Sequence, residues 1–177
     1  WEAGLSHPNA ERLLALIHLD LWGNRIDLSF QSSLAHGNSG SHEDLLVDDS
    51  ERVVNHLQNT KGDVHFIADN TGTELAMDLA LTDALFDLGV SRVVFHLKMH
   101  PTFVSDTTVP DMHIMLDRMA SEEHGFKTAQ LGARLQKALN EGRLRLAPDF
   151  FWNSPYVLRD MPARLSSVFQ GAALVIS

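Results

Sequence analysis

The stretch FIADNTGTEL, residues 66–75, decides the fold. An apolar run ends at Asp69 and Asn70, a turn containing Gly72 follows, and a helical pattern then begins. Parallel α/β sheets place their ligand sites where a strand ends and a helix starts. A carboxylate and an amide side by side at that point can each give an oxygen to a hard divalent cation. The stretch therefore predicts an α/β fold with a metal site at the carboxyl edge of a parallel sheet.

The same rhythm of strand and helix continues on both sides of this stretch. Gly89 is in the position expected of the C-cap of the helix at 74–88. Asp49 or Ser50 is a candidate N-cap for the helix at 51–59. Strands alternating with helices of 10–15 residues are typical of a parallel sheet, in which we expect the strands at 64–68, 92–97 and 173–176 to be neighbours or nearly so. The apolar patterns predict strands at 64–68, 92–97, 144–146 and 173–176, and helices at 8–21, 51–59, 74–88, 111–119, 126–140 and 162–170.

Composition limits the classes of function. The chain has 177 residues, of which 44% are hydrophobic, enough for one domain with a real core. No apolar run of 18 residues occurs, so we expect no membrane span. A formal net charge of −9 argues against a nucleic-acid partner, which needs clustered Lys and Arg. The sequence has no Cys, which excludes thiolate metal sites, and with no basic-then-apolar signal segment we expect a cytoplasmic protein.

A second acidic residue follows the next strand along the chain. Asp106 lies in PTFVSDTT, residues 101–108. Two carboxylates and one amide oxygen, from Asp69, Asp106 and Asn70, suit Mg²⁺ or Mn²⁺ and leave coordination positions for water and substrate. All three residues also have a simpler explanation, because Asp and Asn are favoured caps of helix N-termini.

Two further residues near the predicted sheet edge have two interpretations each. Glu74 lies one helical turn after Asn70, where it could orient a ligand or a water, or could act as a capping-box glutamate. Lys98 ends a strand, where its charge would suit a phosphate oxygen, or would simply be solvated.

Three motifs together resemble those of one family. They are LWGNRIDLS at residues 21–29, ADNTGTEL at residues 68–75 and LKMHPTFVSDTT at residues 97–108. In this order they resemble the motifs of the DUF89 family, also called the damage-control phosphatases or the ARMT1-like metal-binding domain. Two differences from the family's motifs are mild: Thr71 and Thr73 stand where Ala and Phe are commoner. The family also continues past its last strand with a Lys-Gly-Asp segment at the substrate pocket, whereas this sequence ends at Ser177.

The resemblance implies a three-layer α/β/α, Rossmann-like parallel sheet with a partial helical segment at the amino end. We therefore expect one domain over 1–177, with a helical segment and loop over 1–43 and an α/β core over 44–177, incomplete at both ends. The implied activity is that of a metal-dependent phosphatase acting on small phosphorylated metabolites such as sugar phosphates. Mn²⁺ or Mg²⁺ would be the cofactor, with Co²⁺ or Ni²⁺ as further candidates.

The resemblance also assigns roles to residues. By motif, the family's metal ligands fall on Asp69, Asn70 and Asp106; adding the charge of Lys98 at the sheet edge, we expect Asp69, Asp106 and Lys98 to be the catalytic set. The expected substrate-binding residues are Asn24, Glu74, Lys98, Thr71, Gly72 and Thr73, the last three through N–H groups at a helix N-terminus. The sequence leaves open whether water or an Asp is the nucleophile, and it does not predict the oligomeric state.

Two other classes of function remain as alternatives. One is a non-catalytic domain that binds a metal or ligand. The other is a methyltransferase that uses S-adenosylmethionine to modify protein carboxylates, although the Gly-rich loop that such an enzyme needs after its first strand is not found.

Overall fold

The computed structural model describes residues 9–21 and 45–177. Most of the helical segment and loop expected over 1–43, including the WGN motif and Asn24, lies outside these residues. The helices are α1 (Asn9–Leu21), α3 (Ser50–Asn59), α4 (Thr73–Leu88), α5 (Val109–Ala120), α6 (Phe126–Asn140) and α7 (Ala163–Ser166), with short 3-10 turns η3 (Glu122–His124), η4 (Phe150–Asn153), η5 (Leu158–Asp160) and η6 (Ser167–Phe169). The strands are β1 (Val64–Ile67), β2 (Val93–Leu97), β3 (Leu144–Pro148) and β4 (Leu174–Ile176).

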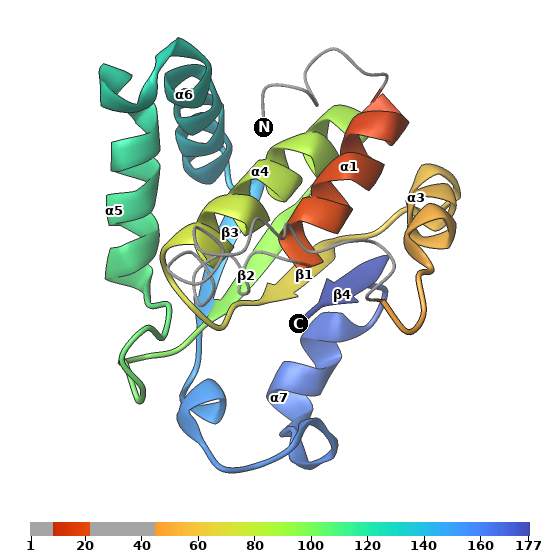
Figure 1. The fold of residues 1–177 in the computed structure, drawn as a ribbon. Coiled ribbons are helices and arrows are strands. Elements are labelled where there is room, and N and C mark those ends of the chain that lie inside the picture. The colour runs from red at the N-terminus through yellow and green to blue at the C-terminus, as the bar shows by residue number, and fades with distance from the viewer. Residues whose placement is uncertain (1–8, 22–44) are drawn as a thin grey trace.

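The four strands form one parallel sheet in the order β3-β2-β1-β4 (Figure 1). Val64 of β1 pairs with Val93 of β2 on one side and with Leu174 of β4 on the other. The predicted parallel α/β fold is therefore confirmed, as is the expectation that these three strands are neighbours.

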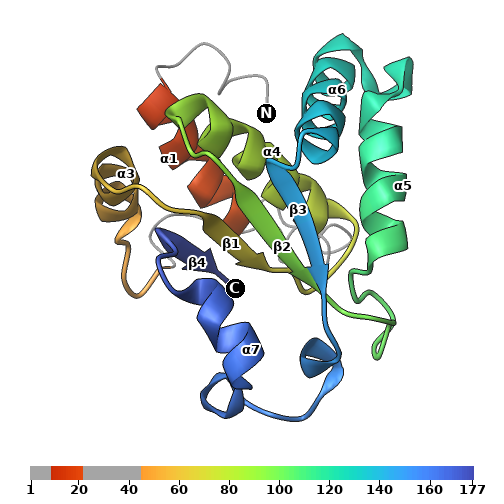
Figure 2. The same ribbon diagram turned by 180° about the vertical axis from the view of Figure 1, so that it is seen from behind.

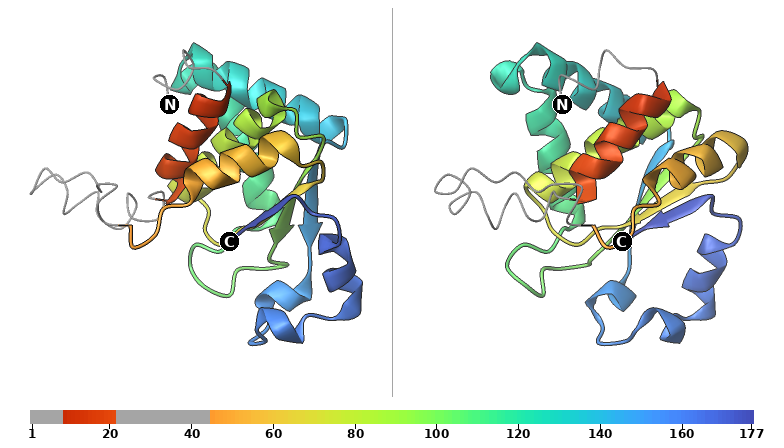
Figure 3. Two further views of the ribbon diagram at one scale, coloured as in Figure 1. Left: turned by 90° about the vertical axis from the view of Figure 1, so that its right-hand side faces the viewer. Right: turned by 45° about the vertical axis from the view of Figure 1, so that its right-hand side comes forward.

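Helices cover the two faces of the sheet unequally. Figure 3 shows α1, α3, α4, α5 and α6 on one side of the strands and α7 on the other, which gives the three layers expected. Alternate residues of each strand point into the larger layer of helices. Phe66 and Phe95 are two of them, and their rings stack with centroids 4.7 Å apart. The same core contains Leu75 and Leu79 of α4 and Leu116 of α5, all buried.

The segment from η4 to η6 lies on the side of the opposite face of the sheet, which faces the viewer in Figure 2, and packs against part of that face. Two buried histidines, His65 and His96, lie here because they alternate with the core phenylalanines. His65 Nδ1 and His96 Nε2 are 3.0 Å apart, so one donates and the other accepts a hydrogen bond. Phe169 stacks on His96 with ring centroids 4.7 Å apart, and the edge of Trp152 meets the same ring.

Because of this buried histidine pair, we expect the folded protein to lose stability in acid. Burial lowers the pKa of His96 from 6.5 to about 4. Between those values the unfolded chain binds a proton at His96 that the folded chain does not, so stability falls as the pH falls through this window. We expect urea denaturation to give a free energy of unfolding about 2 kcal/mol lower at pH 4.5 than at pH 7 from this group alone. His96→Phe keeps a ring against Phe169 and should flatten the decline; an unchanged slope in this variant would contradict the explanation.

The end of the helix expected at 162–170 and the capping of α3 differ from the sequence prediction, and α5 begins at Val109, two residues before the expected start. The helix expected at 162–170 is α-helical only as far as Ser166 and continues as a 3-10 turn. Ser166 and Ser167 direct their hydroxyls to the carbonyls of Ala163 and Arg164, and such bonds compete with a regular helix. At the start of α3, neither expected residue provides a side-chain cap: Asp48 Oδ1 accepts the N–H of Ser50 at 2.9 Å.

Within the described residues, no helix has the length and apolar character needed to cross a membrane.

Candidate functional site

Two loops at the carboxyl edge of the sheet are joined to each other by backbone hydrogen bonds. One follows β1 and the other follows β2. The N–H of Thr107 donates to the carbonyl of Asp69 at 2.8 Å, and the N–H of Thr71 donates to that of Ser105 at 2.7 Å. Asn70 and Asp106 lie opposite each other as an antiparallel bridge between these bonds. This pairing brings together residues that are far apart in the sequence.

Lys98 is the centre of the group. Its Nζ donates to Asp69 Oδ1 at 2.7 Å and to Asp106 Oδ1 at 2.6 Å. Because both oxygens accept from the same Nζ, they can be no further apart than the sum of these lengths, which is close to the greatest separation of two ligands of one cation at roughly 2.0–2.6 Å. The structure thus brings the two predicted carboxylates to one point and places the Lys98 ammonium between them.

Asp106 is the buried member of the pair. Only 4% of its surface is exposed. Its second oxygen, Oδ2, accepts the N–H groups of Thr102 and Phe103 at 2.7 and 2.8 Å. Burial acts to raise the pKa of Asp106, but Lys98 and these two N–H donors hold the pKa below its usual value. Asp106 therefore stays ionised and keeps Oδ1 directed at the centre of the site.

Asp69 is the exposed member. Its side chain is 65% exposed, whereas that of Lys98 is 14% exposed. Burial would lower the pKa of Lys98, but hydrogen bonds to Asp106 and Asp69 outweigh it and raise that pKa. The site consequently has one fixed carboxylate, one solvent-accessible carboxylate and a permanently charged ammonium.

Asn70 is fixed by its neighbours on both sides. Its Oδ1 accepts the hydroxyl of Ser105 at 2.7 Å, and its Nδ2 donates to Glu74 Oε2 at 3.1 Å. Glu74 also reaches back to the N–H of Asn70 at 3.2 Å, so it has features of both interpretations, orienting a neighbour and closing the start of a helix. An amide oxygen has two lone pairs, so the Oδ1 that meets Ser105 keeps one for a further partner.

The helix N-terminus beside these residues is only partly available to a phosphate. The N–H of Thr71 is already bonded to the carbonyl of Ser105, so it does not face a ligand. Gly72 has φ 83°, a left-handed conformation that favours glycine, and it turns the chain into α4 at Thr73. The predicted contacts of Gly72 and Thr73 with a phosphate stay predictions. Asn24 lies outside the described residues.

A residue that the sequence did not single out holds the second loop in place. Asn153 of η4 accepts the N–H of Met99 at 2.8 Å and donates to the carbonyl of His100 at 2.7 Å and to Thr102 Oγ1 at 2.8 Å. Thr102 is one of the two N–H donors to Asp106. No sequence signal marks Asn153, because its partners are about 50 residues away. Ser105 lies inside a motif, but its contact with Asn70 depends on the pairing of the loops.

The donor set fits a hard divalent cation. Within residues 9–21 and 45–177 no group of three or more His, Asp or Glu side chains gathers as a metal cage. The convergent donors are the two carboxylates, which with Lys98 leave a net negative charge, whereas the Asn70 amide turns its Nδ2 toward Asp69 Oδ2 at 3.3 Å and its Oδ1 toward Ser105. A sparse oxygen set of this kind suits Mg²⁺, which usually keeps several waters and is held by one or two carboxylates.

Comparison with known proteins shows the family of this chain. The model of the damage-control phosphatase ARMT1-like domain matches residues 3–177. The chain belongs to this family. Damage-control phosphatase ARMT1 of Danio rerio is 32% identical over 94% of this chain, and that of Homo sapiens is 31% identical over 86%. The protein of the same name from Xenopus laevis is 29% identical over 94%.

This ARMT1-like chain spans well under half the length of those relatives. It aligns with 42% of the Danio rerio protein and with 38% of the human one. The part matched by the family model includes Asp69, Lys98 and Asp106.

Proposed function

We propose that this chain forms the cation-binding part of a phosphatase that hydrolyses small phosphorylated metabolites, with sugar phosphates among the candidates. One observation supports the proposal above the others: Asp69 and Asp106 meet at a single ammonium at the carboxyl edge of the sheet. This is where open α/β sheets bind ligands. The relatives' names agree with phosphatase chemistry.

The proposed reaction is the hydrolysis of a phosphomonoester. Oxygen from water forms a new bond to phosphorus, the bond from phosphorus to the ester oxygen breaks, and the alcohol leaves with a proton while inorganic phosphate forms. Asp69, Asp106 and the Asn70 oxygen would hold Mg²⁺ or Mn²⁺, which when bound supplies Lewis-acid stabilisation of the phosphoryl charge.

The chain's own residues have distinct parts in this proposal. Asp106, fixed by Thr102 and Phe103, gives a ligand that does not need to reorganise. Lys98 offsets the charge of the two carboxylates and offers an ammonium to a phosphate oxygen. Gly72 and Thr73 begin α4, whose N-terminal dipole favours an anion at the same place.

A metal-dependent assay tests the proposal. The protein that contains this chain would be given a panel of phosphomonoesters with Mg²⁺, Mn²⁺, Co²⁺ or Ni²⁺, and inorganic phosphate would be measured with and without a chelator. We expect release that needs the cation. No release with any cation would favour a domain that binds without catalysis, and release that resists chelation would overturn the metal assignment.

Lys98→Gln should separate cation binding from substrate binding. Removing the ammonium leaves Asp69 and Asp106 without their positive partner, so Mn²⁺ should bind at least as tightly as in the wild type. The same change removes a charge offered to phosphate, so kcat/KM should fall by about 10- to 100-fold, chiefly through KM. Lys137→Gln, an exposed lysine of α6 paired with Glu141, is the matched control and should change neither quantity. Weaker Mn²⁺ binding in Lys98→Gln would contradict this role.

A further inference from the structure

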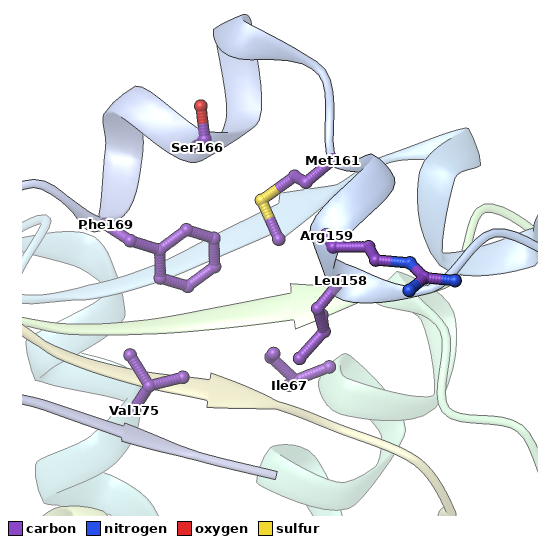
Figure 4. A pocket seen from close by; sticks show the side chains of 7 residues that line it. All are labelled: Ile67, Leu158, Arg159, Met161, Ser166, Phe169 and Val175. Carbon is purple, nitrogen blue, oxygen red and sulfur yellow. The ribbon is translucent and has the colours of Figure 1, made fainter.

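A pocket of about 560 Å³ lies on the face of the sheet opposite the main core (Figure 4). Its floor is formed by Ile67 of β1 and Val175 of β4. The wall above them comes from the segment η5 to η6, which supplies the remaining lining residues: Leu158, Arg159, Met161, Ser166 and Phe169. A pocket of this size, mostly apolar with a few polar groups, is typical of a small-molecule site.

The strand order places this pocket at the topological switch point. The chain runs from β1 to β2 to β3 in one direction across the sheet and then returns to place β4 on the other side of β1. In open α/β sheets, ligands bind outside the carboxyl ends of the two strands where the order reverses. These strands are β1 and β4, and each contributes a residue to the floor of the pocket.

The pocket is also continuous in sequence with the candidate metal site. Ile67 is the last residue of β1 and lies two residues before Asp69. The wall segment is attached to the second site loop, since Asn153 of η4 holds Met99 and Thr102. In addition, Arg164 of α7 forms an ion pair with Asp149 at the start of η4, through an Nη2–Oδ1 contact of 2.9 Å. The wall and the site loop are therefore held by one set of contacts.

The side chains that line the pocket differ in polarity. In Figure 4, Phe169, Met161 and Leu158 face Ile67 and Val175 across the cavity, whereas the hydroxyl of Ser166 points away from them. The guanidinium of Arg159 extends toward the side at which β1 ends. In the part of the chain that the structure describes, no carboxylate pairs with Arg159. A ligand here would meet apolar surface on several sides and one cation at the rim.

From this geometry we propose that the pocket holds the organic part of the phosphomonoester and selects an organic part that has an apolar face and an acidic group. The phosphate would lie at Asp69 and Asp106, the apolar face against Met161 and Phe169, and the acidic group at Arg159. This inference rests on the proposed function and narrows its substrate class. An unsubstituted sugar is a poorer match, because its hydroxyls would lose water without finding enough polar partners among the lining side chains.

Kinetics with three esters of primary alcohols would test the inference. Benzyl phosphate, 4-carboxybenzyl phosphate and glucose 6-phosphate release leaving groups of the same class and differ in the part that would enter the pocket. We expect kcat/KM to be highest for 4-carboxybenzyl phosphate, at least about tenfold above glucose 6-phosphate. A wild-type preference for glucose 6-phosphate would overturn the inference and leave the proposed function intact.

Two variants separate the apolar wall from the cation. Met161→Gln keeps the length of the side chain and should lower kcat/KM for both benzyl esters about tenfold, with glucose 6-phosphate within about twofold. Arg159→Gln should remove the advantage of 4-carboxybenzyl phosphate over benzyl phosphate. Val168→Gln, next to Phe169 but outside the lining, and Arg118→Gln on α5 are the matched controls. Variants that lower all three substrates equally would contradict a role in selection.

A binding measurement distinguishes failure of this inference from failure of the proposed function. Benzylphosphonate cannot be hydrolysed, and methionine methyl NMR would follow its binding in the presence of Mg²⁺. We expect the Met161 methyl signal to shift while that of Met119, buried in α5, stays in place. If no ester is hydrolysed but this shift is seen, the proposed function fails and the pocket assignment stands. Binding that leaves Met161 unchanged overturns the pocket assignment whatever the activity.

Discussion

Asp106→Asn is expected to lower kcat/KM for cation-dependent phosphate release about a thousandfold or more, equivalent to about 4 kcal/mol of transition-state stabilisation. The substitution keeps the shape of the side chain but removes the charge that faces Lys98. An amide has only one oxygen, so it cannot both accept the N–H groups of Thr102 and Phe103 and present an oxygen to Lys98, and its NH₂ group must face one of these donors. Cation affinity should fall together with activity.

The comparison with a second aspartate makes this prediction specific. Asp117 lies on the surface of α5, where Gln136 donates to it at 2.8 Å, and Asp117→Asn changes the net charge by the same amount. Mn²⁺ binding by calorimetry and phosphate release should be unchanged in that variant. If Asp106→Asn keeps more than a tenth of the wild-type activity while folded, Asp106 is not a ligand in the proposed reaction.

The periodic parts of the chain were the predictable ones. β1, β2 and α4 follow from apolar runs and from helical spacing that Gly89 ends, with φ 105° in the left-handed region. The convergence of Asp69 and Asp106 also followed, because parallel strands bring their carboxyl ends to one edge. These features depend on local patterns and on one rule of topology.

The unpredicted contacts depend on pairings between distant segments. Lys98 was expected to face a phosphate, and the structure adds that it joins Asp69 to Asp106. The contact of Asn153 with the loop before Asp106 spans about 50 residues and leaves no periodic trace. The His65–His96 pair likewise follows from strand register, since residues on adjacent parallel strands are brought together only by pairing.

The largest effect on stability is expected at Asp83, where three helices are joined. Its carboxylate accepts Arg12 Nη2 of α1 at 2.7 Å and both Nε and Nη2 of Arg134 of α6 at 2.8 Å. The side chains of Asp83 and Arg12 are only 4% and 6% exposed. Asp83→Ala removes the carboxylate that is buried together with Arg12 and leaves that guanidinium only its more exposed partner Asp87, so the free energy of unfolding should fall by about 3–5 kcal/mol.

Asp87 provides the matched control for burial. It pairs with the same Arg12, but its side chain is 46% exposed. Exposed pairs contribute about 0–1 kcal/mol, so Asp87→Ala should change stability little in the same urea denaturation. Equal losses in the two variants would mean that burial of the Asp83 pair does not determine the loss of stability.

A double change, Arg12→Met with Asp83→Leu, tests the mechanism directly, because it removes both buried charges and should recover part of the loss seen in Asp83→Ala. Arg134 can then turn to solvent, since its side chain is 47% exposed. A double variant as unstable as Asp83→Ala would show that the ion pair itself, rather than the buried Arg12 charge that Asp83→Ala leaves behind, determines the stability of this three-helix junction.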